Sequence, residues 1–441
     1  MNNAHTIFRP SALRWGAPVA AFFATAAVLA VANHEPQADL AADLGPAVSA
    51  AGLEPATAHG IARLEHAVEA EPDSATAFTS LGDFYLQGAR ETADSAFLER
   101  ADAAYTAAES RDPQNAVAAA GRATVALAGH RFADGLALAN EAHRLEPALV
   151  RPYALITDAQ IELGRYGAAG RTLERMLRLK PTLAAYARVS YYRELNGDLN
   201  GAVQAMRLAA SAGGGSAESS AYVEHLLGKL EVRRGNFARA ERDFERALSV
   251  APGYAPAIAG VARVAVARGN FHASITGYRE AVARLPNAEN ATALADALLA
   301  AGRHHAAERA YDRAIAIARR DPVEVNQELA MLEADHGSPA RALAAAQEAW
   351  RKAPGLKSAE ALGWALHRTG KSERGLVFAR RALELGRSDP SLLYRFGRVA
   401  IGAGHAGQAR SALHRALTIN PRFHPVQAPI AQRLLADLRA H

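Results

Sequence analysis

A helix–turn–helix pattern that recurs along the chain is the feature that most constrains its fold. In the stretch 227–252, LGKLEVRRGNFARAERDFERALSVAP, apolar residues fall at helical spacing on both sides of a turn, and a proline ends the second helix. Gly228 and Ala240 are small where two helices must cross closely, and Phe244 is the residue expected to fill the space between them. Gly235 suits the left-handed backbone that ends the first helix. One such hairpin cannot bury its apolar face alone, so we expect stacked copies.

Nine further segments repeat this pattern in phase with it. They are Thr76–Pro113, Ala116–Pro147, Val150–Pro181, Leu183–Ser211, Tyr254–Pro286, Asn287–Arg320, Pro322–Pro354, Gly355–Gly386 and Ser388–Pro421. A half unit precedes them, with Gly60, Leu64 and Ala67 at helical spacing. The inter-helix segment of the first full unit is longer than the pattern allows, so either its helices or its turn must be extended.

The repeated unit resembles the tetratricopeptide repeat, a helix–turn–helix motif of roughly 34 residues. The resemblance covers roughly residues 56–425 and implies an all-α fold: a right-handed superhelix, or tetratricopeptide solenoid, of about ten helix–turn–helix repeats. The predicted organisation is a signal peptide or membrane anchor at 1–32, a linker at 33–55, a first repeat segment at 56–212, a Gly/Ser-rich hinge loop at 213–220, a second repeat segment at 221–425 and a capping helix at 426–441.

The first 32 residues have the pattern of an export signal. Arg9 and Arg14 precede 18 residues without charge, and Ala30-Val31-Ala32 has the small-x-small form of a cleavage site. An uncharged stretch of this length is also at the lower limit for spanning a bilayer, so a single retained N-terminal anchor is the alternative. Both interpretations place the repeats outside the cytoplasm. We therefore expect an exported bacterial protein that is periplasmic, envelope-associated or secreted.

Composition and motifs argue against an enzyme. The chain has no cysteine, which excludes disulfides, thiolate metal sites and cysteine nucleophiles. The net charge of +5 is small for 441 residues, and basic and acidic residues alternate on the helices, so no nucleic-acid partner is expected. His304 and Glu308 have the spacing of a helical metal pair but fall in a turn where the repeat usually carries polar residues. We predict no catalytic residues, no cofactor and no metal.

In proteins with this repeat, the first helices of successive units line a concave surface where ligands usually bind. Carried onto this sequence, that resemblance predicts a binding face of Tyr191, Tyr222, His225, Lys229, Arg263, Trp364, His367, Tyr394 and Arg398, with Asp158, Asp296, Gln327 and Met331 on the same wall. Tyrosine, tryptophan and arginine dominate binding hot spots, although each residue could instead pack against the neighbouring unit. Lys229 and Arg263 stand in adjacent units and could hold a carboxylate together. The paired asparagines of the family's carboxylate clamp are absent here, which argues against recognition of a chain terminus in that manner.

The predicted function is a non-enzymatic scaffold that binds an extended peptide or partner protein in its concave groove. The alternative is a polysaccharide-binding component of an envelope export or assembly system, with the aromatic residues stacking on sugar rings. Salt distinguishes the two partners, because an acidic glycan should bind more weakly at high ionic strength and an apolar peptide should not.

Overall fold

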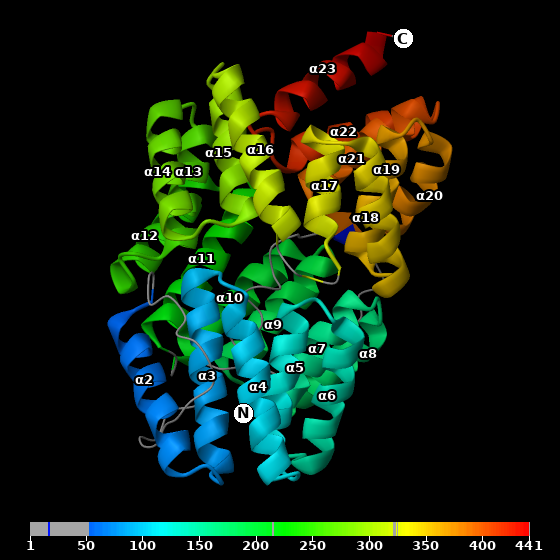
Figure 1. Cartoon of the computed structure of the whole chain (residues 1–441). Helices are drawn as coiled ribbons and strands as arrows, with labels where there is room; N and C mark the ends of the chain where they lie inside the picture. The colour runs from blue at the N-terminus through cyan, green and yellow to red at the C-terminus, as the bar shows by residue number, and fades with distance from the viewer. Residues whose placement is uncertain (1–15, 18–52, 214–215, 321–322, 324, 441) are drawn as a thin grey trace. The chain divides into compact units, whose positions relative to one another are not determined.

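The computed structural model describes residues 16–17, 53–213, 216–320, 323 and 325–440 (Figure 1). Over these residues the chain forms helices α2 to α23, joined by short turns. Ten helix pairs follow one another: α3 (Ala75–Thr92) with α4 (Ala96–Arg111), α5 (Ala116–Ala128) with α6 (Phe132–Leu145), α7 (Val150–Glu162) with α8 (Tyr166–Leu179), α9 (Leu183–Leu195) with α10 (Leu199–Ala212), α11 (Ala217–Arg233) with α12 (Phe237–Val250), α13 (Ala255–Ala267) with α14 (Phe271–Arg284), α15 (Ala288–Ala300) with α16 (His304–Arg320), α17 (Gln327–His336) with α18 (Pro339–Lys352), α19 (Leu356–Arg368) with α20 (Ser372–Arg381), and α21 (Pro390–Gly402) with α22 (Ala406–Ile419). The half unit is α2 (Pro55–Ala70), and the predicted final helix is α23 (Gln427–Ala440).

The predicted all-α class and its ten helix–turn–helix units are confirmed. The extra residues of the first unit lengthen α3 to 18 residues, and Ala93 then ends this helix in the left-handed region with φ of 55°. A two-residue parallel pairing of β1 (Gly16–Ala17) with β2 (Arg387–Ser388) is the only strand pairing among the described residues.

Small residues let one aromatic ring fill the space between consecutive units. The Phe244 ring of α12 is 1% exposed, and a Cβ built on either Gly228 of α11 or Gly260 of α13 would lie 2.4 Å from it. Tyr105 of α4 has the same surroundings, because added Cβ atoms at Gly82 and Gly121 would lie 2.6 and 2.4 Å from its ring. Glycine is therefore required on both helices that sandwich the ring, since any side chain would collide with it.

The turns within the pairs use a left-handed glycine. Gly235 has φ of +75°, and its N–H donates to the Val232 carbonyl at 3.0 Å. The Asn236 N–H then donates to the Glu231 carbonyl at 2.8 Å, which satisfies a carbonyl at the end of α11. The Asn236 side chain donates to the Glu231 carboxylate at 2.7 Å. These bonds fix the angle at which α12 leaves the turn.

The contacts divide the chain into two units, each described here by itself. One contains residues 21–184 and 321–324, and the other contains residues 1–20, 185–320 and 325–441; we call the latter the C-terminal unit. Helices α10 and α11, on either side of the predicted hinge loop, belong to the C-terminal unit. Four residues of that loop, 217–220, are helical, because the Ser216 hydroxyl caps α11 by accepting from the Ser219 N–H at 3.2 Å. That 213–220 acts as a hinge stays a prediction.

The predicted signal or anchor and the linker fall outside the described residues, apart from Gly16, Ala17 and residues 53–55. Among the helices that the structure describes, none is both long enough and apolar enough to cross a membrane.

Candidate binding face

The nine predicted binding residues all lie on first helices of their pairs. Tyr191 is on α9; Tyr222, His225 and Lys229 are on α11; Arg263 is on α13; Trp364 and His367 are on α19; Tyr394 and Arg398 are on α21. All nine belong to the C-terminal unit, whereas Asp158 of the predicted wall belongs to the other unit. We call the face formed by the first helices α11, α13, α15, α17, α19 and α21 the inner wall.

The four predicted aromatic residues are buried. Tyr191, Tyr222, Trp364 and Tyr394 are between 0% and 4% exposed. The Trp364 indole Nε1 donates to the Asp335 carboxylate at 2.9 Å, so its polar edge is satisfied inside the protein. Rings at this exposure pack between units and do not present a face on which a sugar or a peptide could stack.

His225 is also part of the packing. Its imidazole is 9% exposed and lies 5.7 Å from the Phe244 ring and 6.1 Å from the Tyr254 ring, measured between ring centroids. Burial lowers the pKa of His225 well below its usual value, and the charge of Lys229 lowers it further. The imidazole is therefore neutral at physiological pH.

Four of the predicted residues meet at α19 and α21. His367 stacks on Trp364 with centroids 5.1 Å apart, and the Arg398 guanidinium lies 5.9 Å from the Trp364 ring centroid. Arg398 Nη1 donates to the Tyr394 hydroxyl at 2.8 Å. Burial, together with the positive charges of Arg398 and Arg368, lowers the pKa of His367 to about 4. Arg398 and His367 are half-buried and form the accessible part of this group.

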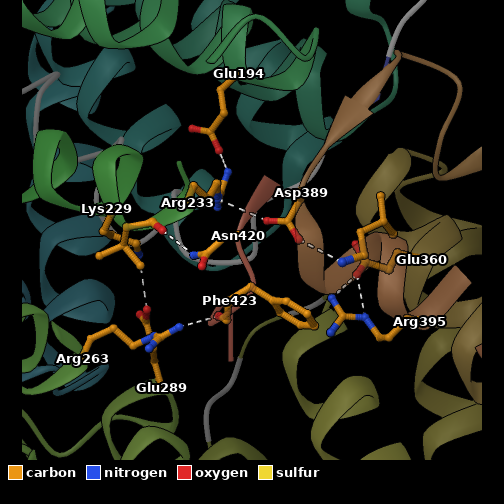
Figure 2. A network of polar contacts seen from close by, with 12 residues as sticks. Glu194, Lys229, Arg233, Arg263, Glu289, Glu360, Asp389, Arg395, Asn420 and Phe423 are labelled. Atoms are coloured by element: carbon orange, nitrogen blue, oxygen red, sulfur yellow. Dashed lines mark hydrogen bonds and ion pairs between the residues drawn. The ribbon is translucent and has the colours of Figure 1, made fainter. Parts of the chain in front are cut away.

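Lys229 and Arg263 do not converge on one carboxylate site, because each is engaged within the chain (Figure 2). The Lys229 ammonium pairs with Glu289 of α15 at 3.3 Å. Arg263 Nη2 donates to the carbonyl oxygens of Phe423 and, at 3.3 Å, Arg422. Both residues lie on first helices as the sequence pattern predicted, but that pattern could not show what they contact.

The partner of Arg263 is the loop between α22 and α23, residues 420–424, which contacts the inner wall far upstream in the sequence. The Asn420 side-chain amide donates to the Val232 carbonyl of α11 at 2.7 Å. Arg422 Nη1 donates to the Ala267 carbonyl at the end of α13 at 3.3 Å, and its guanidinium lies 4.8 Å from the Phe237 ring centroid. Asn420 is fully buried and Phe423 is 7% exposed, so this loop is an integral part of the inner wall.

The same loop reaches α15 through His424. His424 Nε2 lies 3.2 Å from the Asp296 carboxylate, and Nδ1 accepts from the backbone N–H groups of Val426 and Gln427 at 3.2 and 3.3 Å. An imidazole that accepts at Nδ1 carries its hydrogen on Nε2, which can then donate to Asp296. Burial alone would raise the pKa of Asp296, but His424 and a 2.6 Å hydrogen bond from Tyr311 lower it below its usual value.

A second long-range contact closes the C-terminal unit. Figure 2 shows Arg233 of α11 between Glu194 of α9 and Asp389, the residue that caps α21. Arg233 Nε lies 3.2 Å from Asp389 Oδ2, and its Nη1 pairs with Glu194. Each of these side chains is at most 17% exposed. The sequence analysis missed Arg233 because no local pattern distinguishes it from Arg234 beside it, which pairs within its own helix with Glu231.

A local signal for the 420–424 loop does exist. The connections that follow three of the other unit-ending prolines begin with Gly253, Asn287 and Gly355, which are ordinary turn residues. After the last unit the chain reads Arg422-Phe423-His424, two basic side chains flanking a large ring. A connection of this composition indicates a segment that packs against something other than its sequence neighbours.

The described residues show no metal-binding cluster. No group of three or more histidine, aspartate and glutamate side chains gathers there in a way that could hold a metal ion. His304 and Glu308, which we predicted to fall in a turn, lie instead in the first turns of α16. Beside them, His305 lies 3.4 Å from Glu308, and both of these side chains are exposed and form a surface pair.

Comparisons with known proteins agree with this architecture. The tetratricopeptide repeat profile matches residues 261–322, which run from α13 to the end of α16. The matched residues form two of the ten helix–turn–helix pairs of the all-α fold. Among solved structures the chain is similar to a chain of the APC/C hetero-tetramer Cut9–Hcn1, at 14% identity and a TM-score of 0.36, over 87% of this chain and 93% of that one. Comparison with curated proteins gives no match.

Proposed function

We propose that this protein is a non-enzymatic scaffold that binds an extended segment of a partner protein along its inner wall. The observation that supports the proposal is the pairing of Arg263 with two consecutive main-chain carbonyls, those of Arg422 and Phe423. An arginine that hydrogen-bonds backbone oxygens recognises a main chain whatever its side chains are. The inner wall of α11, α13 and α15 thus already binds main-chain carbonyls, supplied by the turn at residues 420–424 of its own chain.

A protein partner is a better candidate than a glycan. Sugar recognition through stacking needs aromatic rings on the surface, and the four rings predicted for that role are at most 4% exposed. Half-buried residues of the inner wall include Lys229, His367 and Arg398, whose polar groups suit backbone and side-chain oxygens of a polypeptide.

We further propose that the protein acts outside the cytoplasm of a bacterium, after export by its N-terminal segment. The support is the sequence pattern of residues 1–32, two arginines followed by an uncharged stretch and a small-x-small site. Fractionation of the native host followed by N-terminal sequencing tests it. A mature terminus at Asn33 in a soluble extracytoplasmic pool indicates cleavage, and an intact Met1 in the membrane pool indicates an anchor. An intact Met1 in the cytoplasm refutes export.

Site-specific photo-cross-linking in the native host tests the scaffold function. A photoreactive amino acid replaces Lys229 or Arg398 on the inner wall and, as a control, the exposed Arg242 of α12. We expect one partner protein to be cross-linked from both inner-wall positions and not from Arg242. The purified partner should then bind the wild-type chain, and an Arg398→Ala chain more weakly. Equal cross-linking from Arg242, or no adduct from the inner wall, would contradict the proposal.

A further inference from the structure

The 420–424 loop contacts three consecutive units that precede it by well over a hundred residues. Asn420 contacts α11, Arg422 contacts α12 and α13, and His424 contacts α15. Most connections between units only turn the chain, as where the Tyr254 N–H donates to the Ala251 carbonyl three residues before it. The 420–424 loop therefore makes contacts that its connecting role does not require.

The contacts are those of a bound peptide. Two main-chain carbonyls accept from Arg263, the Asn420 side chain donates to a main-chain carbonyl, the Arg422 cation lies over the Phe237 ring, and an imidazole meets the Asp296 carboxylate. Main-chain bonds give such a segment affinity, and the side-chain contacts give it specificity.

Arg263 also retains unused binding capacity. Its Nη1 is buried and donates no hydrogen bond to any described residue, although Nη2 is engaged. A buried donor without an acceptor is costly, so a segment that supplied one more oxygen at this point would bind better than the loop does. The loop thus leaves one donor of the inner wall unsatisfied.

Building on the proposed function, we propose that the 420–424 loop is an internal ligand which the partner must displace from the inner wall. The partner segment that replaces it is an extended polypeptide of similar chemistry: an amide side chain, then a basic and an aromatic residue, then a hydrogen-bond donor for Asp296. Loop and partner are mutually exclusive, because both need Arg263 and the carbonyl of Val232.

Tethering makes the loop an effective competitor. A short intramolecular connection gives an effective concentration on the order of millimolar, so a partner competes with the loop even where the direct contacts are equal. The apparent affinity of the partner equals its intrinsic affinity multiplied by the fraction of molecules whose loop is already displaced, so a small fraction weakens binding. Loosening the loop should therefore strengthen binding in trans.

The first test uses the loop's own sequence as the probe. A fluorescent peptide of residues 417–427, LTINPRFHPVQ, is titrated into the full chain and into Asn420→Asp/Arg422→Ala. Asn420→Asp removes the donor to Val232 but keeps Oδ1, which accepts from the Arg422 N–H at 2.9 Å. We expect the variant to bind the peptide at least about tenfold more tightly than wild type, and Arg263→Ala in the variant to remove most of that gain.

Matched controls separate displacement from unfolding. Arg410→Ala changes an exposed arginine of α22 and should leave peptide binding at the wild-type level. A peptide with Ala at positions 420, 422 and 424 should not bind the loosened variant. A loosened variant that is folded by circular dichroism and binds the peptide no better than wild type would overturn the proposal.

A second variant covers the case in which the loosened chain does not fold. The chain has no cysteine, and a Cβ on Gly235 would lie 3.6 Å from Asn420 Cγ, so Gly235→Cys/Asn420→Cys can lock the loop by a disulfide. Cysteine at Gly235 is strained by the left-handed backbone there, so circular dichroism must first show that both redox forms are folded. Oxidised protein should bind the peptide at least about tenfold more weakly than the same protein reduced. Equal binding in the two redox states would refute displacement.

These results are independent of the scaffold proposal. If no partner is cross-linked from the inner wall but the peptide still exchanges with the loop, the scaffold function fails and the internal-ligand role stands. If a partner is cross-linked and binds equally to the locked and reduced forms, the internal-ligand role fails and the scaffold function stands.

Discussion

Replacing Gly260 with alanine should destabilise the C-terminal unit, although the same change usually stabilises a helix. Alanine in a helix interior is favoured over glycine by about 0.8–1.0 kcal/mol. Here the new Cβ would lie 2.4 Å from a Phe244 ring atom, about 1 Å closer than ordinary contact, and Gly228 confines the ring from the other side. A ring that is 1% exposed can yield only by shifting a helix, and such overpacking costs roughly 1–3 kcal/mol. We expect a net loss of up to about 2 kcal/mol after the helix-propensity gain of about 1 kcal/mol.

Urea and thermal denaturation of the full chain measure this loss, with Gly407→Ala as the matched control. Gly407 is an exposed helical glycine of α22 with no atom within 4 Å of an added Cβ, so alanine there should be neutral or stabilising. Gly260→Ala should lower the melting temperature by a few degrees, at about 2–4 °C per kcal/mol for a unit of this size. Combining it with Phe244→Leu should recover part of the loss, because the smaller side chain makes room. If Gly260→Ala stabilises as Gly407→Ala does, the close-approach argument is wrong.

Three further changes test other parts of the reasoning. Ala247→Leu should cost roughly 1–3 kcal/mol, since Ala247 is fully buried against two other buried alanines, and an unchanged melting temperature would refute close packing there. Glu333→Gln should lower the free energy of unfolding, measured by urea denaturation, by about 1–3 kcal/mol, because the 1%-exposed carboxylate accepts from two arginines and a backbone N–H. Glu348→Gln, at an exposed pair, should change it little. His367, with its pKa lowered to about 4, binds a proton less readily folded than unfolded, so stability should fall as the pH drops from about 6.5 toward 4. Solvent screening reduces the expected loss of unfolding free energy to about 1 kcal/mol at pH 5. Urea denaturation at pH 5 and pH 7 measures this loss, and it should be smaller in His367→Asn than in wild type.

The helix pairs could be predicted from the sequence because their determinants are local. The glycine of each turn, the small residues at each crossing and the ring between them stand at fixed spacing, so ten copies in phase specify ten hairpins. Both ends of most helices agree with the predicted units within a few residues, as at Tyr254–Pro286, where α13 and α14 run from Ala255 to Arg284. The predicted loop at 213–220 is shorter in the structure because Ser216 caps α11, a signal present in the sequence.

The binding face could be predicted by position but not by exposure. The family pattern places Tyr222 and Trp364 on first helices, and they are there. Whether an inward-facing ring packs between units or remains on the surface depends on how closely the neighbouring first helix approaches, and repeat spacing carries no information on this distance. In this protein the rings are buried, and the charged residues beside them contact other parts of the chain.

Closure of the C-terminal unit by contacts between distant repeats changes how its stability should be understood. In a simple solenoid each unit contacts only its neighbours, so stability is a sum of local terms and the ends can unfold alone. Here the carbonyl of Val232 accepts from Asn420, and Arg233 pairs with Asp389, across 188 and 156 residues. Burying a charged side chain such as Arg233 is unfavourable unless both partners are in place, so these contacts favour the arrangement in which early and late repeats are docked together. Under the internal-ligand proposal, displacing the loop would free Arg263 and break the contacts of Asn420 with Val232 and of Arg422 with Ala267, which would link partner binding to the conformation of the unit.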